Sequence, residues 1–123
     1  MDTENKSEKV VRGEVYMVDF GNALGSEQGG IRPALILQNN TGNFYAPTTI
    51  VCPMTTRKKR LAATHVTLFP AECGLLKPSI VLCEQVRVVD KQRIGKRIGL
   101  LTNQKTLSEI EQKMKLSLGI VFN

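Results

Sequence analysis

The chain has 123 residues, which suits a single domain and leaves no room for two. With 17 Lys and Arg residues against 11 Asp and Glu residues, its net charge is +6, which favours a polyanionic partner such as a nucleic acid. Aromatic residues make up 5% of the chain and Trp is absent, so the core must consist mainly of Val, Ile and Leu.

The cysteines and the N-terminal segment bear on where the protein works. Cys52, Cys73 and Cys83 are odd in number and have no CxxC spacing, so we interpret them as reduced core or near-core residues of a cytosolic protein. The first nine residues are polar and lack the apolar region of a signal peptide, and no apolar run is long enough to span a membrane. We therefore expect a cytoplasmic protein without membrane contact.

The N-terminal third predicts a tail followed by strands and a flexible loop. Residues 1–9 have mixed charges and suggest a disordered tail, and residues 10–123 form the single domain. Apolar residues at even spacing predict a strand over residues 10–20. Four glycines in residues 21–30 indicate a loop, and the continuous apolar run of residues 34–37 indicates a buried strand.

The middle of the chain continues in short segments. Residues 39–43 (NNTGN) are typical of a turn, and residues 48–54 predict a strand in which Pro53 must lie at a bulge or an edge. Residues 64–69 alternate as in a strand with one buried face. Residues 70–74 predict one helical turn that ends at a glycine.

The C-terminal third predicts one long strand and one helix. Residues 80–89 predict the clearest strand, with Ile80, Leu82, Val86 and Val88 on one face, interrupted by Glu84. Residues 90–99 are basic and contain two glycines. Residues 106–109 (TLSE) form a capping box, and Leu107, Ile110, Met114 and Leu118 then recur at helical spacing. Many short strands with one C-terminal helix favour a mainly β fold, a small bent barrel or sheet with added helices.

The glycine-rich segment of residues 25–33 (GSEQGGIRP) is the most specific local feature. Its backbone can approach a ligand closely, but it is neither a P-loop nor a GxGxxG motif. Arg32 lies between this loop and the buried strand, where its planar guanidinium could bind a phosphate. Equally, Arg32 could pair with a carboxylate such as Glu27 and only hold the loop in place.

Two hydroxyls and four cations form the second candidate, at residues 55–60 (TTRKKR). Thr55 and Thr56 could donate to phosphate oxygens while Arg57 and Lys58 follow a nucleic-acid backbone. The alternative is a solvated loop whose charges keep the protein soluble, which is the commoner situation for an isolated charge run.

Other titratable residues give weaker signals. His65 is the single histidine, so a pair of histidines cannot act within one chain, and a strand residue with a hydrogen-bonding role is the better interpretation. Glu84 and Gln85 interrupt an apolar strand, and Glu84 could pair with an arginine or point into a cleft. No His, Cys or carboxylate residues have metal-ligand spacing, so we expect neither a metal nor another cofactor.

Several blocks of the sequence closely resemble the MazF/PemK toxins of type II toxin–antitoxin systems, especially their Gram-positive branch. The similarity extends from about Val10 to the C-terminal helix. The blocks are residues 12–16 (RGEVY), 25–30 (GSEQGG), 32–36 (RPALI), 38–39 (QN), 50–51 (IV), Thr55, residues 64–66 (THV) and 84–87 (EQVR).

This resemblance implies an SH3-like barrel of the CcdB/PemK type with a C-terminal helix, assembled as a homodimer. It implies sequence-specific, metal-independent cleavage of single-stranded mRNA at sites such as UACAU, leaving a 2′,3′-cyclic phosphate and a 5′-hydroxyl. Translation and growth would stop until a cognate MazE-like antitoxin neutralised the toxin, and operator DNA would be bound only by the toxin–antitoxin complex.

Position by position, the resemblance places catalysis on Arg32 and Thr55, with Glu27 in support. The residues expected to contact RNA are Ser26, Gln28, Gly29, Thr56, Arg57, Lys58, Gln85 and Arg87.

Two other functions fit the same fold. A gyrase poison of the CcdB kind would act through its C-terminal helix without catalysis, and a noncatalytic barrel would bind nucleic acid only. The Arg32/Thr55 pair and the basic segment favour the nuclease.

Overall fold

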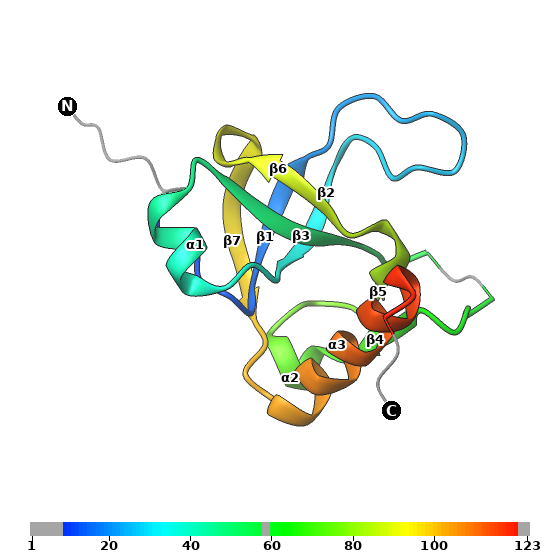
Figure 1. Ribbon diagram of the computed structural model, residues 1–123. Coiled ribbons are helices and arrows are strands. Elements are labelled where there is room, and N and C mark those ends of the chain that lie inside the picture. The colour runs from blue at the N-terminus through cyan, green and yellow to red at the C-terminus, as the bar shows by residue number, and fades with distance from the viewer. Residues whose placement is uncertain (1–8, 58–59, 121–123) are drawn as a thin grey trace.

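The computed structural model describes residues 9–57 and 60–120 (Figure 1). Its strands form one antiparallel sheet in the order β4-β5-β3-β2-β1-β7, and β6 also pairs with β3. The strands are β1 (Glu14–Asp19), β2 (Ile31–Ile36), β3 (Thr48–Thr55), β4 (His65–Leu68), β5 (Ser79–Leu82), β6 (Arg87–Asp90) and β7 (Ile94–Leu100).

Over residues 9–57 and 60–120, helices α1 to α3 and the short 3-10 helices η2 and η3 accompany the strands. Figure 1 shows α2 and α3 together on the side of β4 and β5, whereas α1 lies at the other end of the sheet. The elements are α1 (Asn40–Tyr45), α2 (Pro70–Cys73), α3 (Gln104–Leu118), η2 (Cys83–Gln85) and η3 (Lys91–Arg93). In the described part of the chain, no helix combines the length and apolar character needed to cross a membrane.

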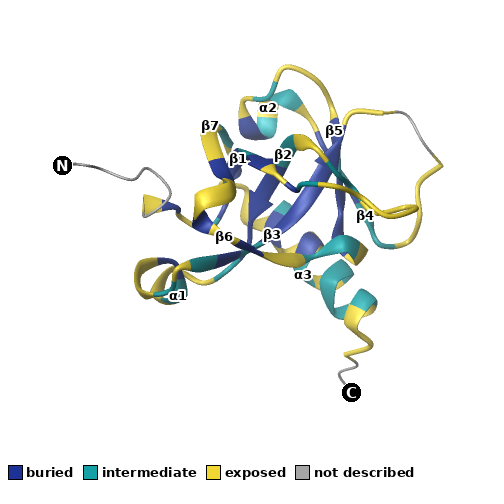
Figure 2. Ribbon diagram, turned by 90° about the horizontal axis from the view of Figure 1, so that it is seen from above, coloured by how far each residue is buried: buried dark blue, intermediate teal, exposed yellow. Residues whose placement is uncertain are grey.

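Alternate residues of the central strands pack into two separate cores, which explains their continuous apolar runs. In β2, Ala34 and Ile36 face one core, whereas Leu35 faces the other. The first core also contains Leu107 and Ile110 of α3. Figure 2 shows the resulting buried strands at the centre of the molecule, with exposed residues along its outer loops. A strand buried on both faces has no polar side to alternate with, so it reads as an unbroken apolar segment.

Most of the elements predicted from the sequence are confirmed. Strands occupy the predicted segments at β1 to β4, and α2 ends at Gly74, which has a φ of +79°. Pro53 lies between the stretches of β3 that pair with β6 and with β5, so its missing N–H interrupts neither ladder. All three cysteines are free and buried. Apart from Lys9, the predicted tail lies outside the described residues.

The prediction of one strand over residues 80–89 is wrong. The structure has β5 and β6 with the η2 turn between them, and both strands run antiparallel to β3. Because the η2 turn separates the two strands, the face predicted from Leu82 does not continue: Val88 is 57% exposed, whereas Val89 is buried.

Three further elements differ from the prediction. The segment read as a turn forms α1, because the Asn39 side chain accepts from the Gly42 N–H at 2.8 Å and caps a helix. The cap of α3 is Asn103 rather than Thr106, and Leu118 at its end is 62% exposed. The basic segment contains β7, which pairs with β1 despite its glycines and cations.

Candidate active site

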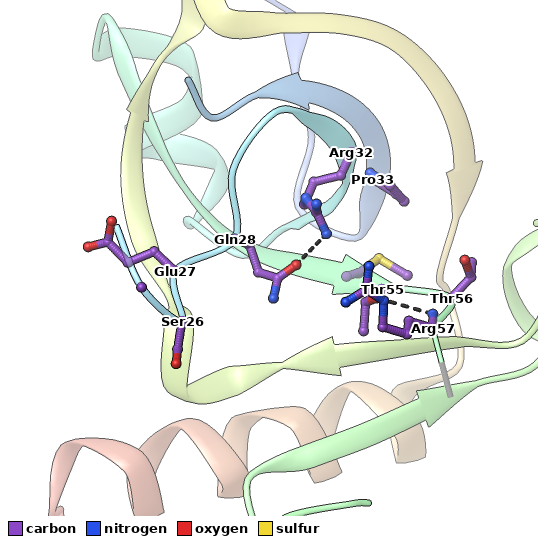
Figure 3. A pocket seen from close by; sticks show the side chains of 10 residues that line it. Ser26, Glu27, Gln28, Arg32, Pro33, Thr55, Thr56 and Arg57 are labelled. Carbon is purple, nitrogen blue, oxygen red and sulfur yellow. Dashed lines mark hydrogen bonds between the residues drawn. The ribbon is translucent and has the colours of Figure 1, made fainter. Parts of the chain in front are cut away.

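A pocket of about 610 Å³ lies between the loop that joins β1 to β2 and the end of β3 (Figure 3). The loop spans residues 21–30 and projects from the strands that carry it (Figure 1). The structure therefore brings together the two segments that the sequence analysis singled out separately. The pocket is lined by Gly25, Ser26, Glu27, Gln28, Arg32, Pro33, Met54, Thr55, Thr56 and Arg57.

Arg32 is the second residue of β2, and its side chain is hydrogen-bonded to residues of the loop. Its Nε–H donates to the Gly29 carbonyl at 2.8 Å, and its Nη1 donates to the Gln28 side-chain oxygen (Figure 3). Both N–H groups of Nη2 have no partner among the described residues. A guanidinium fixed along one edge and open along the other is suited to bind an oxyanion.

Thr55 lies at the end of β3 and is 8% exposed. Its hydroxyl oxygen accepts from the Arg57 N–H at 3.1 Å, and this bond sets the turn that follows the strand. The hydroxyl hydrogen has no acceptor among the described residues. Thr55 can therefore donate to a ligand that enters the pocket beside Arg32.

Glu27 supports the loop rather than pairing with Arg32. Its carboxylate accepts from the Leu24 N–H at 3.0 Å, and the Glu27 N–H donates to the Leu24 carbonyl at 3.0 Å. Figure 3 shows its carboxylate on the side of the loop away from Arg32. The pairing considered for Arg32 from the sequence is thus replaced by bonds to Gln28 and Gly29.

A second pocket of about 550 Å³ adjoins the first, with Ser26, Glu27 and Gln28 lining both. Gln85 and Arg87 line this second pocket. The Arg87 guanidinium lies 5.2 Å from the ring centre of Phe20, which restrains its direction. Lys58, the remaining predicted RNA contact, lies outside the described residues.

Glu84 lines the second pocket, and its Oε2 accepts a hydrogen bond from the His65 Nε2 at 3.1 Å. The His65 side chain is 5% exposed, and its Nδ1 accepts from the Ala62 N–H, which supports a hydrogen-bonding role. Burial raises the pKa of Glu84, but its hydrogen bonds, including those from His65 and the Thr64 hydroxyl, lower it more, so the pKa falls below its usual value. Glu84 therefore pairs with His65 and not with an arginine.

Sequence reasoning missed how the loop is fixed to the barrel. The Gln85 side chain accepts from the Gln28 N–H at 3.1 Å and donates to the Ser26 carbonyl at 3.4 Å. No local pattern signals these contacts, because they depend on where the η2 turn interrupts β5 and β6. In the described part of the chain, no group of three His, Cys, Asp or Glu residues is placed to hold a metal ion.

Fold and site together define a small β-barrel with a pocket lined by an arginine that has one open edge and by a threonine hydroxyl, two donors suited to an oxyanion. Residues 11–118 match the family described as PemK-like, MazF-like toxin of type II toxin–antitoxin system. The chain belongs to this family, as the sequence blocks predicted.

Known relatives agree with this assignment. The chain is 43% identical over 110 residues to endoribonuclease MazF of Staphylococcus saprophyticus, covering 89% of this chain and 91% of that protein. A crystal structure of MazF from Deinococcus radiodurans is 31% identical with a TM-score of 0.76, covering 89% of this chain and 96% of that one. A MazE–MazF crystal structure from the same organism is 30% identical with a TM-score of 0.71, covering 91% and 97%. The predicted barrel of the PemK type with a C-terminal helix is confirmed.

Proposed function

We propose that this chain is the toxin of a type II toxin–antitoxin system and acts as a metal-independent endoribonuclease on single-stranded mRNA in the cytoplasm. RNA cleavage as the class of activity follows from membership of the family and from 43% identity to a MazF endoribonuclease. The observation that carries the finer proposal is the shared pocket, where the open edge of Arg32 and the Thr55 hydroxyl line one cavity.

RNA supplies its own nucleophile, so the pocket has only to align it and stabilise charge. The 2′-oxygen attacks the adjacent phosphorus, the bond to the 5′-oxygen breaks, and the net proton passes from the 2′-oxygen to the 5′-oxygen. Arg32 and Thr55 donate to the non-bridging oxygens as negative charge grows there, and each such donor contributes about 3–4 kcal/mol. The products are a 2′,3′-cyclic phosphate and a 5′-hydroxyl.

The remaining pocket residues bind RNA on either side of the cut. Thr56 and Arg57 lie beside Thr55, whereas Ser26, Gln28 and Arg87 line the adjoining pocket together with the loop. Unpaired bases expose edges that the deep major groove of duplex RNA hides, so this open groove is suited to single strands. We extend the path of the RNA to Gly29 and Lys58 as well, and we propose a UACAU-like recognition site.

Cleavage of a defined single-stranded RNA should continue in excess EDTA and give discrete fragments, while the same sequence in a duplex stays intact. The proposed chemistry uses the 2′-oxygen of the RNA with Arg32 and Thr55 and involves no metal ion, so chelation should not slow it. Gel analysis and sequencing of the fragment ends measure both effects. Intact RNA would favour a gyrase poison or a noncatalytic binder, and activity restored only by Mg²⁺ would contradict the mechanism.

We expect a homodimer, because one chain leaves apolar side chains exposed beside the site. Leu76 is 97% exposed and lines an apolar pocket that shares Pro33 and Thr56 with the candidate active site. Leu118 and Ile120 are also exposed, whereas Leu75 packs on the core. Light scattering at micromolar protein should give twice the chain mass, and Leu76→Asp should weaken the dimer. A monomeric wild type would refute this expectation.

A cognate MazE-like antitoxin should compete with RNA. An acidic tail can fold into the basic groove and mimic the phosphate chain, and operator DNA would then be contacted by the complex. Binding of labelled RNA to the Arg32→Ala variant should weaken progressively as antitoxin is added. A ternary complex with undiminished RNA affinity would exclude competition for one groove.

A further inference from the structure

The loop over the candidate active site has few bonds to the rest of the barrel. Within residues 22–29, the contact between Glu27 and Leu24 is internal to the loop. Among the described residues, the hydrogen bonds that reach residues 22–29 from elsewhere in the chain come from Arg32 and Gln85, whereas Asp19 and Phe20 bond only to the two ends of the loop, Gly21 and Gly30. Since Arg32 is itself the group to be positioned, Gln85 is the fixed point.

Gln28 connects Gln85 to Arg32. Its backbone N–H donates to the Gln85 side-chain oxygen at 3.1 Å, and its own side-chain oxygen accepts from Arg32 Nη1. The Ser26 carbonyl, two residues earlier, accepts from the Gln85 Nε2 at 3.4 Å. One amide side chain thus holds the backbone of the residue that orients the guanidinium.

The turn that carries Gln85 is itself anchored. Glu84, its neighbour, accepts from the Thr64 hydroxyl at 2.9 Å and pairs with His65 at 3.1 Å. The Cys83 N–H donates to the Thr64 carbonyl at 3.2 Å. These contacts join η2 to the start of β4, so the residue that holds the loop, Gln85, is itself fixed to the barrel.

We propose that Gln85 is a positioning residue, which fixes the loop through Ser26 and Gln28 and thereby sets the orientation of Arg32. This role rests on the proposed function of Arg32. It gives Gln85 a task besides direct contact with RNA, since both ends of its amide already bind the loop backbone. A catalytic donor misplaced by about 1 Å can lose up to about 100-fold in rate, so such a connection has a measurable effect on kcat.

Gln85→Met keeps the length of the side chain and removes both bonds. We expect the Gln28 amide to exchange with solvent about five- to tenfold faster, as loss of one hydrogen bond implies, measured by NMR. We also expect kcat to fall by about 10- to 100-fold with little change in KM, for every cleaved sequence alike. Gln85→Glu retains an acceptor for the Gln28 N–H and should restore most of the exchange protection.

Two comparisons isolate the role of Gln85. Gln92→Met makes the same change at an exposed glutamine of η3, away from the loop. It should alter neither the exchange rate of the Gln28 amide nor kcat. Gln28→Met removes the acceptor for Arg32, so adding Gln85→Met to it should lower kcat by less than about twofold more, because the two changes break one connection.

Unchanged exchange at Gln28 overturns the proposal, and so does a fully additive double variant. A KM increase confined to one base position, with kcat intact, would show that Gln85 reads a base instead. Amide exchange is measured by NMR on the protein without RNA, and the NMR resonance of the Arg32 Nε–H reports the orientation of the guanidinium directly. An inactive wild-type protein would therefore refute the proposed nuclease function. An Arg32 resonance that Gln85→Met leaves unchanged would refute the positioning role of Gln85.

Discussion

Replacing Arg32 with alanine should reduce RNA cleavage by at least about 10²–10³-fold, the loss typical of a single preorganised donor, and a gel assay should detect no product. The guanidinium is the positive group that the loop aims into the pocket, with Nε and Nη1 held by Gly29 and Gln28. In the proposed mechanism, its open edge meets the charge that develops on the phosphate. Single-turnover rates on a single-stranded RNA measure the effect.

Arg32→Lys is the matched control, because it keeps the charge and loses the planar fork. It should recover little activity, since an ammonium cannot bind Gly29 and Gln28 and still present two donors to one phosphate. Circular dichroism and the dimer mass should stay unchanged in both variants. Alanine activity near the wild-type rate would show that Arg32 is not in the active site.

Thr55 provides the second arm of the same experiment. Thr55→Val preserves the shape of this buried residue and removes the hydroxyl, so the rate should fall by about 10²-fold, whereas Thr55→Ser should recover most of it. A Thr55→Val rate close to that of the wild type would show that the hydroxyl takes no part in the chemistry and only supports the turn at Arg57.

The components of the site were predictable from the sequence because each lies in a short local motif. Arg32 follows a glycine-rich loop and lies at the start of β2, and Thr55 is the last residue of β3. Their meeting in one pocket is a long-range result, since it depends on β2 pairing with β3 in the register Ala34 to Pro53. The resemblance to a known family supplied that step, which periodicity alone did not.

The errors arose where tertiary contacts outweigh local pattern. Residues 80–89 read as one strand, yet the η2 turn lets Glu84 reach His65 and lets Gln85 reach the loop. The sequence of β7 lacks a strand pattern because Gly95 and Gly99 break the alternation of its side chains. A side chain at Gly99 would lie 2.6 Å from the Cys73 carbonyl, so close packing selects glycine in spite of its low strand propensity.

Gly13 shows how backbone geometry closes the barrel. Its φ is +96°, its N–H donates to the Ile36 carbonyl at 2.9 Å, and its carbonyl accepts from the Leu101 N–H at 2.8 Å. These bonds tie the start of β1 to the ends of β2 and β7. A Cβ at this position would lie 2.7 Å from the Leu101 carbonyl oxygen, a contact that requires the backbone to move.

Gly13→Ala should therefore lower the free energy of unfolding by about 3 kcal/mol, from backbone strain and from the displaced carbonyl together. Gly74→Ala is the control, because φ is +79° there but no atom lies within 4 Å of the added Cβ. Gly74→Ala should lower the free energy of unfolding by about 1 kcal/mol, which is the cost of placing alanine in the left-handed backbone conformation. Urea unfolding at equal protein concentration gives both values. Equal losses in the two variants would mean that the approach of Leu101 to Gly13 does not constrain the barrel.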